Sequence, residues 1–179
     1  MPFITPDSAA LVPSTNSHIS PNGHNRTAFL DTIPSSEIGA ALLAVSDNGY
    51  NVIVGSTAEH PILFHSYAQH PDELEQLRPG LASTAAGRYQ ELYRYWIVYQ
   101  HELGLPDFSP LSQDRVALQQ LHERHALELI DQGLITQAIH AVSNIWASFP
   151  GPGNRYNQWT AKIEDLLAAY TAAGGVLIA

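Results

Sequence analysis

Glu37 is the residue whose type and position most clearly indicate chemistry. It follows an apolar helical pattern of Phe29, Leu30 and Ile33, and a proline stands directly after that pattern. Because proline lacks a backbone N–H and disfavours helical backbone in the residue before it, the pattern predicts a helix over residues 25–33. A carboxyl just beyond a packed helix lies against the core yet near solvent. Burial there raises its pKa, so that it can donate a proton near neutral pH. The alternative interpretation is a solvated glutamate at a helix end.

Short helices and one small sheet are expected to hold this glutamate in place. Alternating β-branched residues predict strands over residues 50–54 and 62–67, which together form a small antiparallel sheet. Many helices beside one small sheet indicate an α+β fold. Helical spacing predicts these helices over residues 71–77, 85–103, 126–131, 136–143 and 158–173, with one more that has Ser109 as N-cap and Pro110 as its first residue.

The chain of 179 residues has the size of one domain preceded by an arm. Residues 1–23 carry several prolines, repeated Ser, Thr and Asn, and only scattered apolar residues. This composition is typical of an extended, flexible segment. We therefore expect an N-terminal arm over residues 1–23 and a folded domain over residues 24–179. The arm is either a linker or a docking segment.

The composition excludes several classes of protein. The chain has no cysteine, which excludes disulfides, thiolate metal sites and a thiol nucleophile. Acidic residues outnumber basic ones 17 to 8, which argues against a nucleic-acid surface. No window approaches the roughly 20 apolar residues of a membrane helix, so we expect no stable membrane insertion. The N-terminus lacks the basic and apolar regions of a signal peptide. We expect a monomer.

The nine histidines suggest a metal site. His122 and His125 are three residues apart on a predicted helix and could ligate one ion. The sequence places no third ligand beside them. It also contains no HExxH motif, no Gly-rich phosphate loop and no Gly-x-Ser-x-Gly motif. We therefore expect neither a metal nor a cofactor.

Two segments stand out because of their residue types and order, namely STAAGRYQ at residues 83–90 and SNIWASFPG at residues 143–151. Shorter motifs lie between and before them, at residues 50–55, 70–71, 107–110, 112–114 and 116–120. Taken together, these segments resemble the bacteriophage lambda type of lysozyme, a family of endolysins. The resemblance spans residues 26–175, and several motifs in one order are far more specific than any single motif.

The resemblance implies a lysozyme-like fold, with a mostly helical lobe, a small antiparallel sheet and a cleft between them. It also implies lytic transglycosylation during phage-induced lysis of the host. This reaction cleaves the MurNAc–GlcNAc β-1,4 bond of peptidoglycan and closes a 1,6-anhydro ring on the muramoyl sugar. The family's acid falls on Glu37. Its second acidic position falls on Asn51, whose amide cannot be a nucleophile or a general base. Glu37 would then act first as acid and afterwards as base for the C6 hydroxyl, and Asp47 is the first candidate if another base exists.

The resemblance further implies contacts with peptidoglycan glycan strands. Amide side chains would bind sugar hydroxyls or amides, and an aromatic ring would stack on a sugar. Residues 73–82 match the opposite lip of the cleft. Two of the aromatic candidates, Tyr89 and Trp146, are also apolar enough to belong to the core. The full set of expected substrate-binding residues is Tyr89, Gln90, Asn144, Trp146, Tyr156 and Gln158.

The chain departs from the family in several places. Apolar residues 38–44 replace a polar loop, insertions occur around residues 56–61 and before Tyr156, and the chain is acidic whereas the lambda enzyme is basic. The alternative function is a non-catalytic wall-binding or virion structural protein on the same fold. We expect synthesis in the host cytoplasm without a signal peptide, and action on the cell wall in the periplasm after release by a membrane pore or from a virion.

Overall fold

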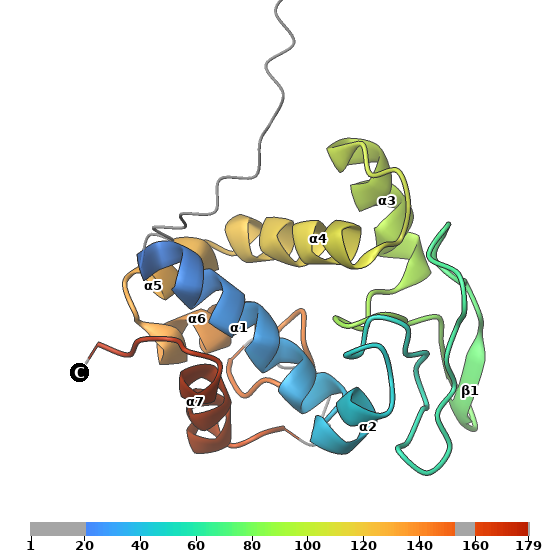
Figure 1. Ribbon diagram of the computed structural model, residues 1–179, viewed down its shortest axis with the longest axis horizontal. Helices are drawn as coiled ribbons and strands as arrows, with labels where there is room; N and C mark the ends of the chain where they lie inside the picture. Colours follow the sequence, from blue (N-terminus) through green and yellow to red (C-terminus); the bar gives the residue numbers. More distant parts are fainter. Residues whose placement is uncertain (1–20, 153–159, 179) are drawn as a thin grey trace, which may run out of the picture.

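Helix α1 (Pro21–Glu37) lies at the centre of the helical part of the molecule (Figure 1). The computed structural model describes residues 21–152 and 160–178. Apolar residues of α1 such as Phe29 and Ile33 are fully buried in the main hydrophobic core. The helices around α1 are α4 (Pro110–Glu123), α5 (Ala126–Asp131), α6 (Ile135–Val142) and α7 (Ile163–Ala172), while the short α2 (Ala40–Ala44) follows it and α3 (Tyr93–Leu103) stands further out.

Helix α1 is longer than predicted at both ends. It begins at Pro21, because the first position of a helix needs no backbone donor, and residues 21–23 of the predicted arm are therefore helical. It continues through Pro34 to Glu37, so the predicted end before this proline is wrong. The buried apolar face of α1 stabilises the helix by more than the missing hydrogen bond costs. Glu37 is thus the last residue of the helix.

The start of α1 is fixed to two other parts of the chain. The side-chain amide of Asn25 donates a hydrogen bond to the carbonyl of Ile130, and its Oδ1 accepts one from the N–H of Val176. Arg26 forms a two-pronged ion pair with Asp131, with N···O distances of 2.8 and 2.6 Å. Helix α5 and the C-terminal segment therefore meet at this end of α1.

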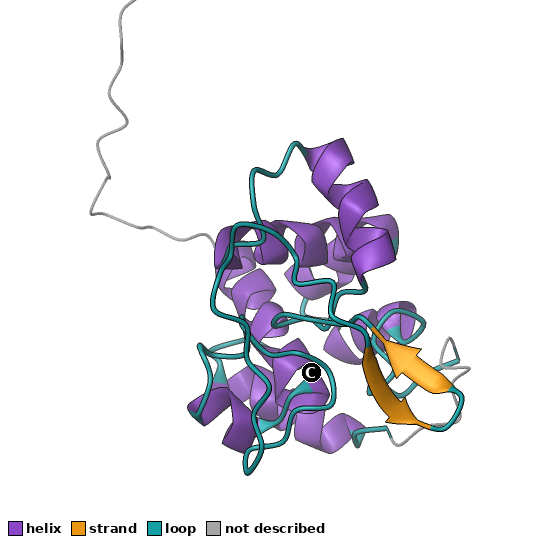
Figure 2. Cartoon of the chain, turned by 90° about the vertical axis from the view of Figure 1, so that its right-hand side faces the viewer, coloured by secondary structure: helices purple, strands orange, loops and turns teal. Residues whose placement is uncertain are grey.

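The sheet is a hairpin of β1 (Glu75–Arg78) and β2 (Leu81–Ser83), which lies away from most of the helices (Figure 2). The predicted helix over residues 71–77 is wrong, because its apolar residues are exposed and Gly80 turns the chain back with a φ of 79°. The predicted strands at 50–54 and 62–67 are reduced to isolated bridges, one between Val52 and Leu63 and one between Ile53 and Ala86. A small antiparallel sheet is present, but other residues build it.

The predicted helix over residues 85–103 begins only at Tyr93, because residues 87–90 form a turn that a bridge between Ala86 and Glu91 closes. Gly87 has a φ of 78°, and a Cβ there would lie 2.3 Å from Oε1 of Gln113. That same oxygen accepts the backbone N–H of Arg88 at 2.9 Å. The close approach of α4 to this turn therefore requires glycine and prevents a continuous helix.

The remaining helices agree closely with the predictions. Helix α3 ends at Gly104 in the left-handed conformation, and α4 begins at Pro110 after Ser109. Helix α5 has the predicted bounds, α6 begins and ends one residue earlier than predicted, and α7 is shorter at both ends. Within the described ranges, no helix combines the length and the apolar character needed to cross a bilayer.

Candidate active site

The Glu37 carboxyl is held through one of its two oxygens. Oε1 accepts a hydrogen bond from the hydroxyl of Ser148 at 2.5 Å and another from the backbone N–H of the same residue at 3.2 Å. Among the described residues, nothing else bonds to this carboxyl, so Oε2 has no protein partner there. Glu37 as a whole residue is partly exposed, while its carboxyl group is largely desolvated.

Burial raises the pKa of Glu37 above its ordinary value, and the two hydrogen bonds from Ser148 oppose this rise. The position at the C-terminal end of α1 acts in the same direction as burial, because the helix dipole disfavours a negative charge there. No neighbouring carboxylate of the described residues is among the causes. A carboxyl that is desolvated but reachable is suited to donate a proton.

Ser148 itself is fixed by its surroundings. Only 8% of it is exposed, and its carbonyl accepts the backbone N–H of Ala161 at 2.8 Å. Its hydroxyl lies 2.7 Å from the hydroxyl of Ser36, on the last turn of α1. The neighbouring Phe149 is fully buried and meets Phe29 edge to face at 6.2 Å. The loop that carries Ser148 is therefore anchored in the same core as α1.

Arg88 connects α1 to the smaller part of the fold. It is almost fully buried, pairs with Asp31 of α1 at 2.6 Å, and donates to the carbonyl of Asn48. Its guanidinium also lies over the Tyr50 ring, 5.0 Å from the ring centre. These contacts fix α1 against the turn at residues 46–50, which follows the glutamate.

Four of the expected substrate-binding residues lie together. Tyr89, Gln90, Asn144 and Trp146 line a pocket of about 330 Å³ that also contacts α3 and α4. Gln90 and Asn144 are partly exposed. Tyr89 and Trp146 belong mainly to the core, with 4% and 3% exposed, and the Trp146 indole donates to the Tyr89 carbonyl at 3.2 Å. These two rings therefore support the pocket and offer little face for stacking. Tyr156 and Gln158 lie outside the described residues.

Asn51, the position expected to lack a carboxylate, forms a hydrogen bond within a turn. Oδ1 of Asn51 accepts the backbone N–H of Asp47 at 2.9 Å, which closes the turn before it. Asp47 accepts a hydrogen bond from the hydroxyl of Tyr67 at 2.6 Å. In the described part of the chain, no three histidine, aspartate or glutamate side chains come together as a metal site.

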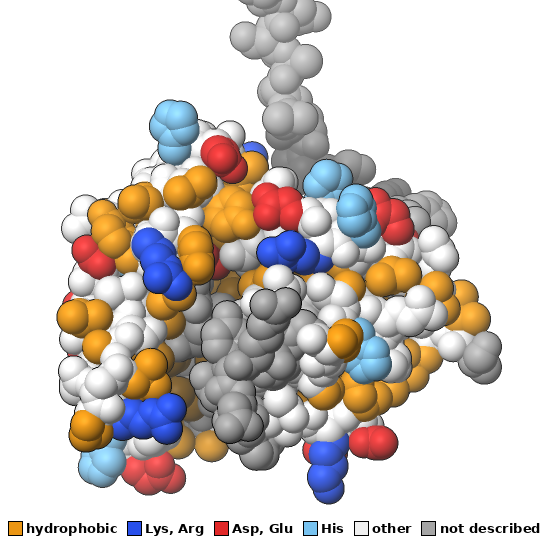
Figure 3. Space-filling model, turned by 180° about the vertical axis from the view of Figure 1, so that it is seen from behind, with side chains coloured by type: hydrophobic (Ala, Val, Ile, Leu, Met, Phe, Trp, Pro, Cys, Tyr) orange, Lys and Arg blue, Asp and Glu red, His pale blue; other side chains and the backbone are white. Residues whose placement is uncertain are grey.

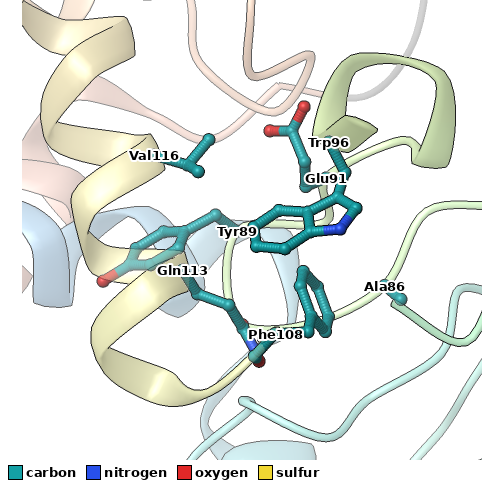
Figure 4. A pocket seen from close by; sticks show the side chains of 7 residues that line it. All are labelled: Ala86, Tyr89, Glu91, Trp96, Phe108, Gln113 and Val116. Carbon is teal, nitrogen blue, oxygen red and sulfur yellow. The ribbon is translucent and has the colours of Figure 1, made fainter. Parts of the chain in front are cut away.

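Sequence reasoning missed a second buried glutamate, Glu91, because it lies inside an apolar helical pattern. Only 8% of Glu91 is exposed, and its Oε2 accepts the amide N–H of Gln120 at 2.7 Å. Burial raises its pKa to about 7. Oε1 of Glu91 and Oε1 of Gln120 are buried without a hydrogen-bond partner. Figure 4 shows the small cavity that Glu91 lines, with its carboxyl group turned away from the ring of Phe108.

Basic side chains do not gather into one patch on the face drawn in Figure 3, where they lie scattered among apolar and uncharged ones. The formal net charge of the chain is −9. Neither feature matches the clustered positive charge that binds a nucleic-acid backbone.

Comparisons with known proteins agree with the fold. The family model described as Endolysin matches residues 27–177. The chain is 49% identical to the endolysin of Escherichia phage lambda over 155 residues, which covers 86% of this chain and 94% of the relative. It is 43% identical to the endolysin of Escherichia phage P2 over 172 residues, covering 92% and 99%.

Solved structures show the same similarity. The structure of bacteriophage lambda lysozyme complexed with a chitohexasaccharide superposes with a TM-score of 0.77 at 47% identity, covering 87% of this chain and 97% of that one. A second structure of lysozyme from bacteriophage lambda gives a TM-score of 0.72 with the same identity and coverage. The predicted lysozyme-like α+β fold is thereby confirmed.

Proposed function

Since the chain belongs to the Endolysin family, we propose that it degrades peptidoglycan to lyse the bacterial host of a phage, with Glu37 as the acid. The observation that carries this proposal is the Glu37 carboxyl itself. Its Oε1 is held by Ser148, its Oε2 has no partner among the described residues, and burial raises its pKa. Such a group stays protonated closer to neutral pH than an ordinary glutamate and presents its proton to a bound substrate.

The proposed reaction is lytic transglycosylation of the MurNAc–GlcNAc β-1,4 bond. Glu37 protonates the glycosidic oxygen, and the bond from that oxygen to C1 breaks. The C6 hydroxyl of the muramoyl sugar then attacks C1, and the Glu37 carboxylate takes the hydroxyl proton. Retaining hydrolysis needs a second carboxylate about 5 Å from the acid, and inverting hydrolysis needs a base further away. Asn51 supplies neither, whereas the C6 hydroxyl has the high effective concentration of an intramolecular group.

The proposed substrate is a peptidoglycan glycan strand. The lambda lysozyme structure with a chitohexasaccharide supports a site for β-1,4-linked sugars on this fold. In this chain, Gln90 and Asn144 have partly exposed amides at the same pocket and suit sugar hydroxyls and acetamido groups. Tyr89 and Trp146 would position them from the core. Sugar contacts of Tyr156 and Gln158 stay predictions.

We also propose where the protein acts. It would be made in the host cytoplasm and act as a monomer on the cell wall, after release through a membrane pore or from a virion. The proposed division of the chain is an N-terminal arm over residues 1–23 and a catalytic domain over 24–179, with the qualification that α1 already begins at Pro21.

Mass spectrometry of the muropeptides released from purified sacculi tests the reaction. The proposal expects muramoyl ends that are about 18 Da lighter than hydrolysed ends, because no water is added. Ordinary reducing ends as the main product would show hydrolysis and would direct the search for a base to Asp47. Binding to sacculi without any release would instead support a non-catalytic wall-binding or virion structural protein.

A further inference from the structure

Building on the proposed function, we propose that Ser148, oriented by Ser36, confines the catalytic proton of Glu37 to Oε2, so that one oxygen both gives the proton to the substrate and recovers it. Neither serine carries charge or touches the reacting atoms in this arrangement. Both are positioning residues, and they act through the carboxyl.

The contacts at Oε1 carry the first step. This oxygen receives two donors from one residue, the Ser148 hydroxyl at 2.5 Å and the Ser148 backbone N–H at 3.2 Å. A proton on Oε1 would place a third hydrogen at an oxygen already facing two, and one of these bonds would break. A proton on Oε2 leaves both bonds in place. The same hydrogen bonds therefore serve the protonated and the ionised carboxyl without rotation of the side chain.

The hydroxyl of Ser36 sets the direction of the Ser148 hydroxyl. The two oxygens are 2.7 Å apart, and only one of them can donate to the other. When Ser148 donates its single hydrogen to Glu37, only Ser36 can donate across the contact between the two hydroxyls. The competing acceptor of Ser36 is the carbonyl of Ile33, at the longer distance of 3.4 Å. Ser36 thus favours the arrangement in which Ser148 points at the carboxyl.

The surroundings keep this chain of hydroxyls in place. Ser36 and Glu37 are adjacent on the last turn of α1, so they move together. Ser148 is buried, and the backbone N–H of Ala161 binds its carbonyl. Because Ser148 is held both at its backbone and at its hydroxyl, it can orient the Glu37 carboxyl with a small loss of conformational freedom.

The consequence concerns the two proton transfers of the proposed reaction. The proton leaves Oε2 for the departing glycosidic oxygen as the bond to C1 breaks. The C6 oxygen then bonds to C1 from the face of the ring that the departing oxygen left, because the 1,6-anhydro bridge closes on that face. The proton of the C6 hydroxyl is therefore released near Oε2, the oxygen that has just lost its own proton. A carboxyl whose acceptor oxygen is fixed can complete both proton transfers without rotating.

Two alanine variants and two controls test the assignment. S148A removes the hydroxyl donor, S36A removes only its orienting partner, and S148T keeps a hydroxyl. S35A is the matched control, because the Ser35 hydroxyl donates to the Thr32 carbonyl at 2.6 Å on the same helical turn and forms no hydrogen bond with Ser148. The readouts are the rate of muropeptide release against pH, and the ¹³C titration of Glu37 in protein labelled at glutamate carboxyls, assigned by its loss in E37Q.

S148A is expected to lower kcat about 10- to 100-fold, the effect of losing a hydrogen bond to an ionised group. It should also move the basic limb of the pH profile and the ¹³C titration midpoint to higher pH, because a donor that favours the ionised form is gone. S36A should shift the basic limb and the titration midpoint in the same direction by less. S148T should restore both to the values of the parent, and S35A should match the parent.

An S148A titration and pH profile equal to those of the parent would overturn the assignment, and so would an equal effect of S35A and S36A. Failure of the proposed function can be told apart from failure of this assignment, since in the former case the parent protein would release no muropeptides. The ¹³C titration does not depend on activity and would still decide whether Ser148 and Ser36 control the Glu37 carboxyl.

Discussion

The regions around Glu37 and Glu91 contain the same chemical group in two different settings. In both, burial raises the pKa of the carboxyl. Glu37 is partly exposed at a helix end and is held by donors on one oxygen only. Glu91 is almost fully buried at the wall of the pocket that Gln90 and Asn144 also line, and its Oε2 accepts one hydrogen bond from the amide of Gln120. The comparison teaches that a raised pKa alone does not mark a catalytic acid. Glu91 also has one oxygen without a partner, so the feature that separates the proposed acid from Glu91 is its partial exposure at a helix end.

Protonation of Glu91 would explain its unusual surroundings. Oε1 of Glu91 and Oε1 of Gln120 both lack partners, and both are acceptors when the glutamate is ionised. A proton on Glu91 turns one of these acceptors into a donor. The carboxylic acid is then a neutral polar group in the core, as its amide neighbour is. The protonated carboxyl therefore suits these buried surroundings better than the carboxylate does.

Replacing the two glutamates by glutamine should separate their roles most clearly. Glu37→Gln keeps the shape but cannot deliver a proton, so we expect lytic activity to fall about 10²–10⁴-fold with an unchanged melting temperature. Glu91→Gln should retain activity close to that of the parent. The measurement is turbidity loss of permeabilised Gram-negative cells. A variant at position 37 within threefold of the parent would exclude Glu37 as the acid.

A substitution in the turn before Glu91 tests how much the close fit of that turn contributes to stability. Gly87→Ala places a Cβ against Gln113 at a φ of 78°, so we expect a loss of about 2–5 kcal/mol in the free energy of unfolding. Gly80→Ala is the matched control, with a φ of 79° and open space around the new Cβ, and should cost about 1–2 kcal/mol. Urea unfolding measures both. Equal losses would show that the contact with Gln113 is unimportant.

The pH dependence of stability should report Glu91 directly. Its folded pKa of about 7 lies above the ordinary value of 4.5, so the folded state holds the proton more tightly between these values. Stability from this group is therefore fully present below about pH 4.5 and is lost, by about 3 kcal/mol in total, as the pH rises from there through 7. His70, whose pKa burial lowers, acts in the opposite direction below its ordinary value of 6.5.

Comparison with Glu91→Gln isolates this contribution, because His70 is common to both proteins. The variant should match the parent in urea unfolding at pH 5 and exceed its stability at pH 8. If the parent and the variant have parallel stability curves from pH 5 to 8, then Glu91 does not change its protonation on unfolding in that range.

The smallest effect is expected from removing residues 1–20, which precede α1 and offer few apolar groups to a core. The melting temperature and the lysis of purified sacculi should both stay close to those of the full chain. The deletion leaves both glutamates and their partners in place. A large drop in melting temperature, measured by circular dichroism, would show that the arm contributes to the folded domain.

Sequence reasoning found the features that depend on local pattern and missed those that depend on distant contacts. The Gly104 helix end, the Pro110 start and helix α5 are encoded by neighbouring residues. The passage of α1 through Pro34 depends on packing against helices elsewhere in the chain. In the same way, Ser148 is 111 residues from Glu37, and no local pattern joins them.

The hairpin and Glu91 were missed for a related reason. Residues 71–77 have helical spacing, but the apolar side chains of Leu74 and Leu77 find no core. The pattern around Glu91 indicated a helix, although the fit of Gly87 against Gln113 imposes a turn. In both places tertiary contacts decided what local spacing could not.

The contacts of Asn25 with Ile130 and Val176 bring the two ends of the folded domain to one pole of the molecule. Glu37 stands twelve residues further along the same helix, about 18 Å away at 1.5 Å per residue. A cargo joined at either end would therefore lie far from Glu37. The proposed acid stands at the opposite pole, so a tether, a carrier peptide or a surface attached at the two ends would leave that pole facing a polymer too large to be engulfed.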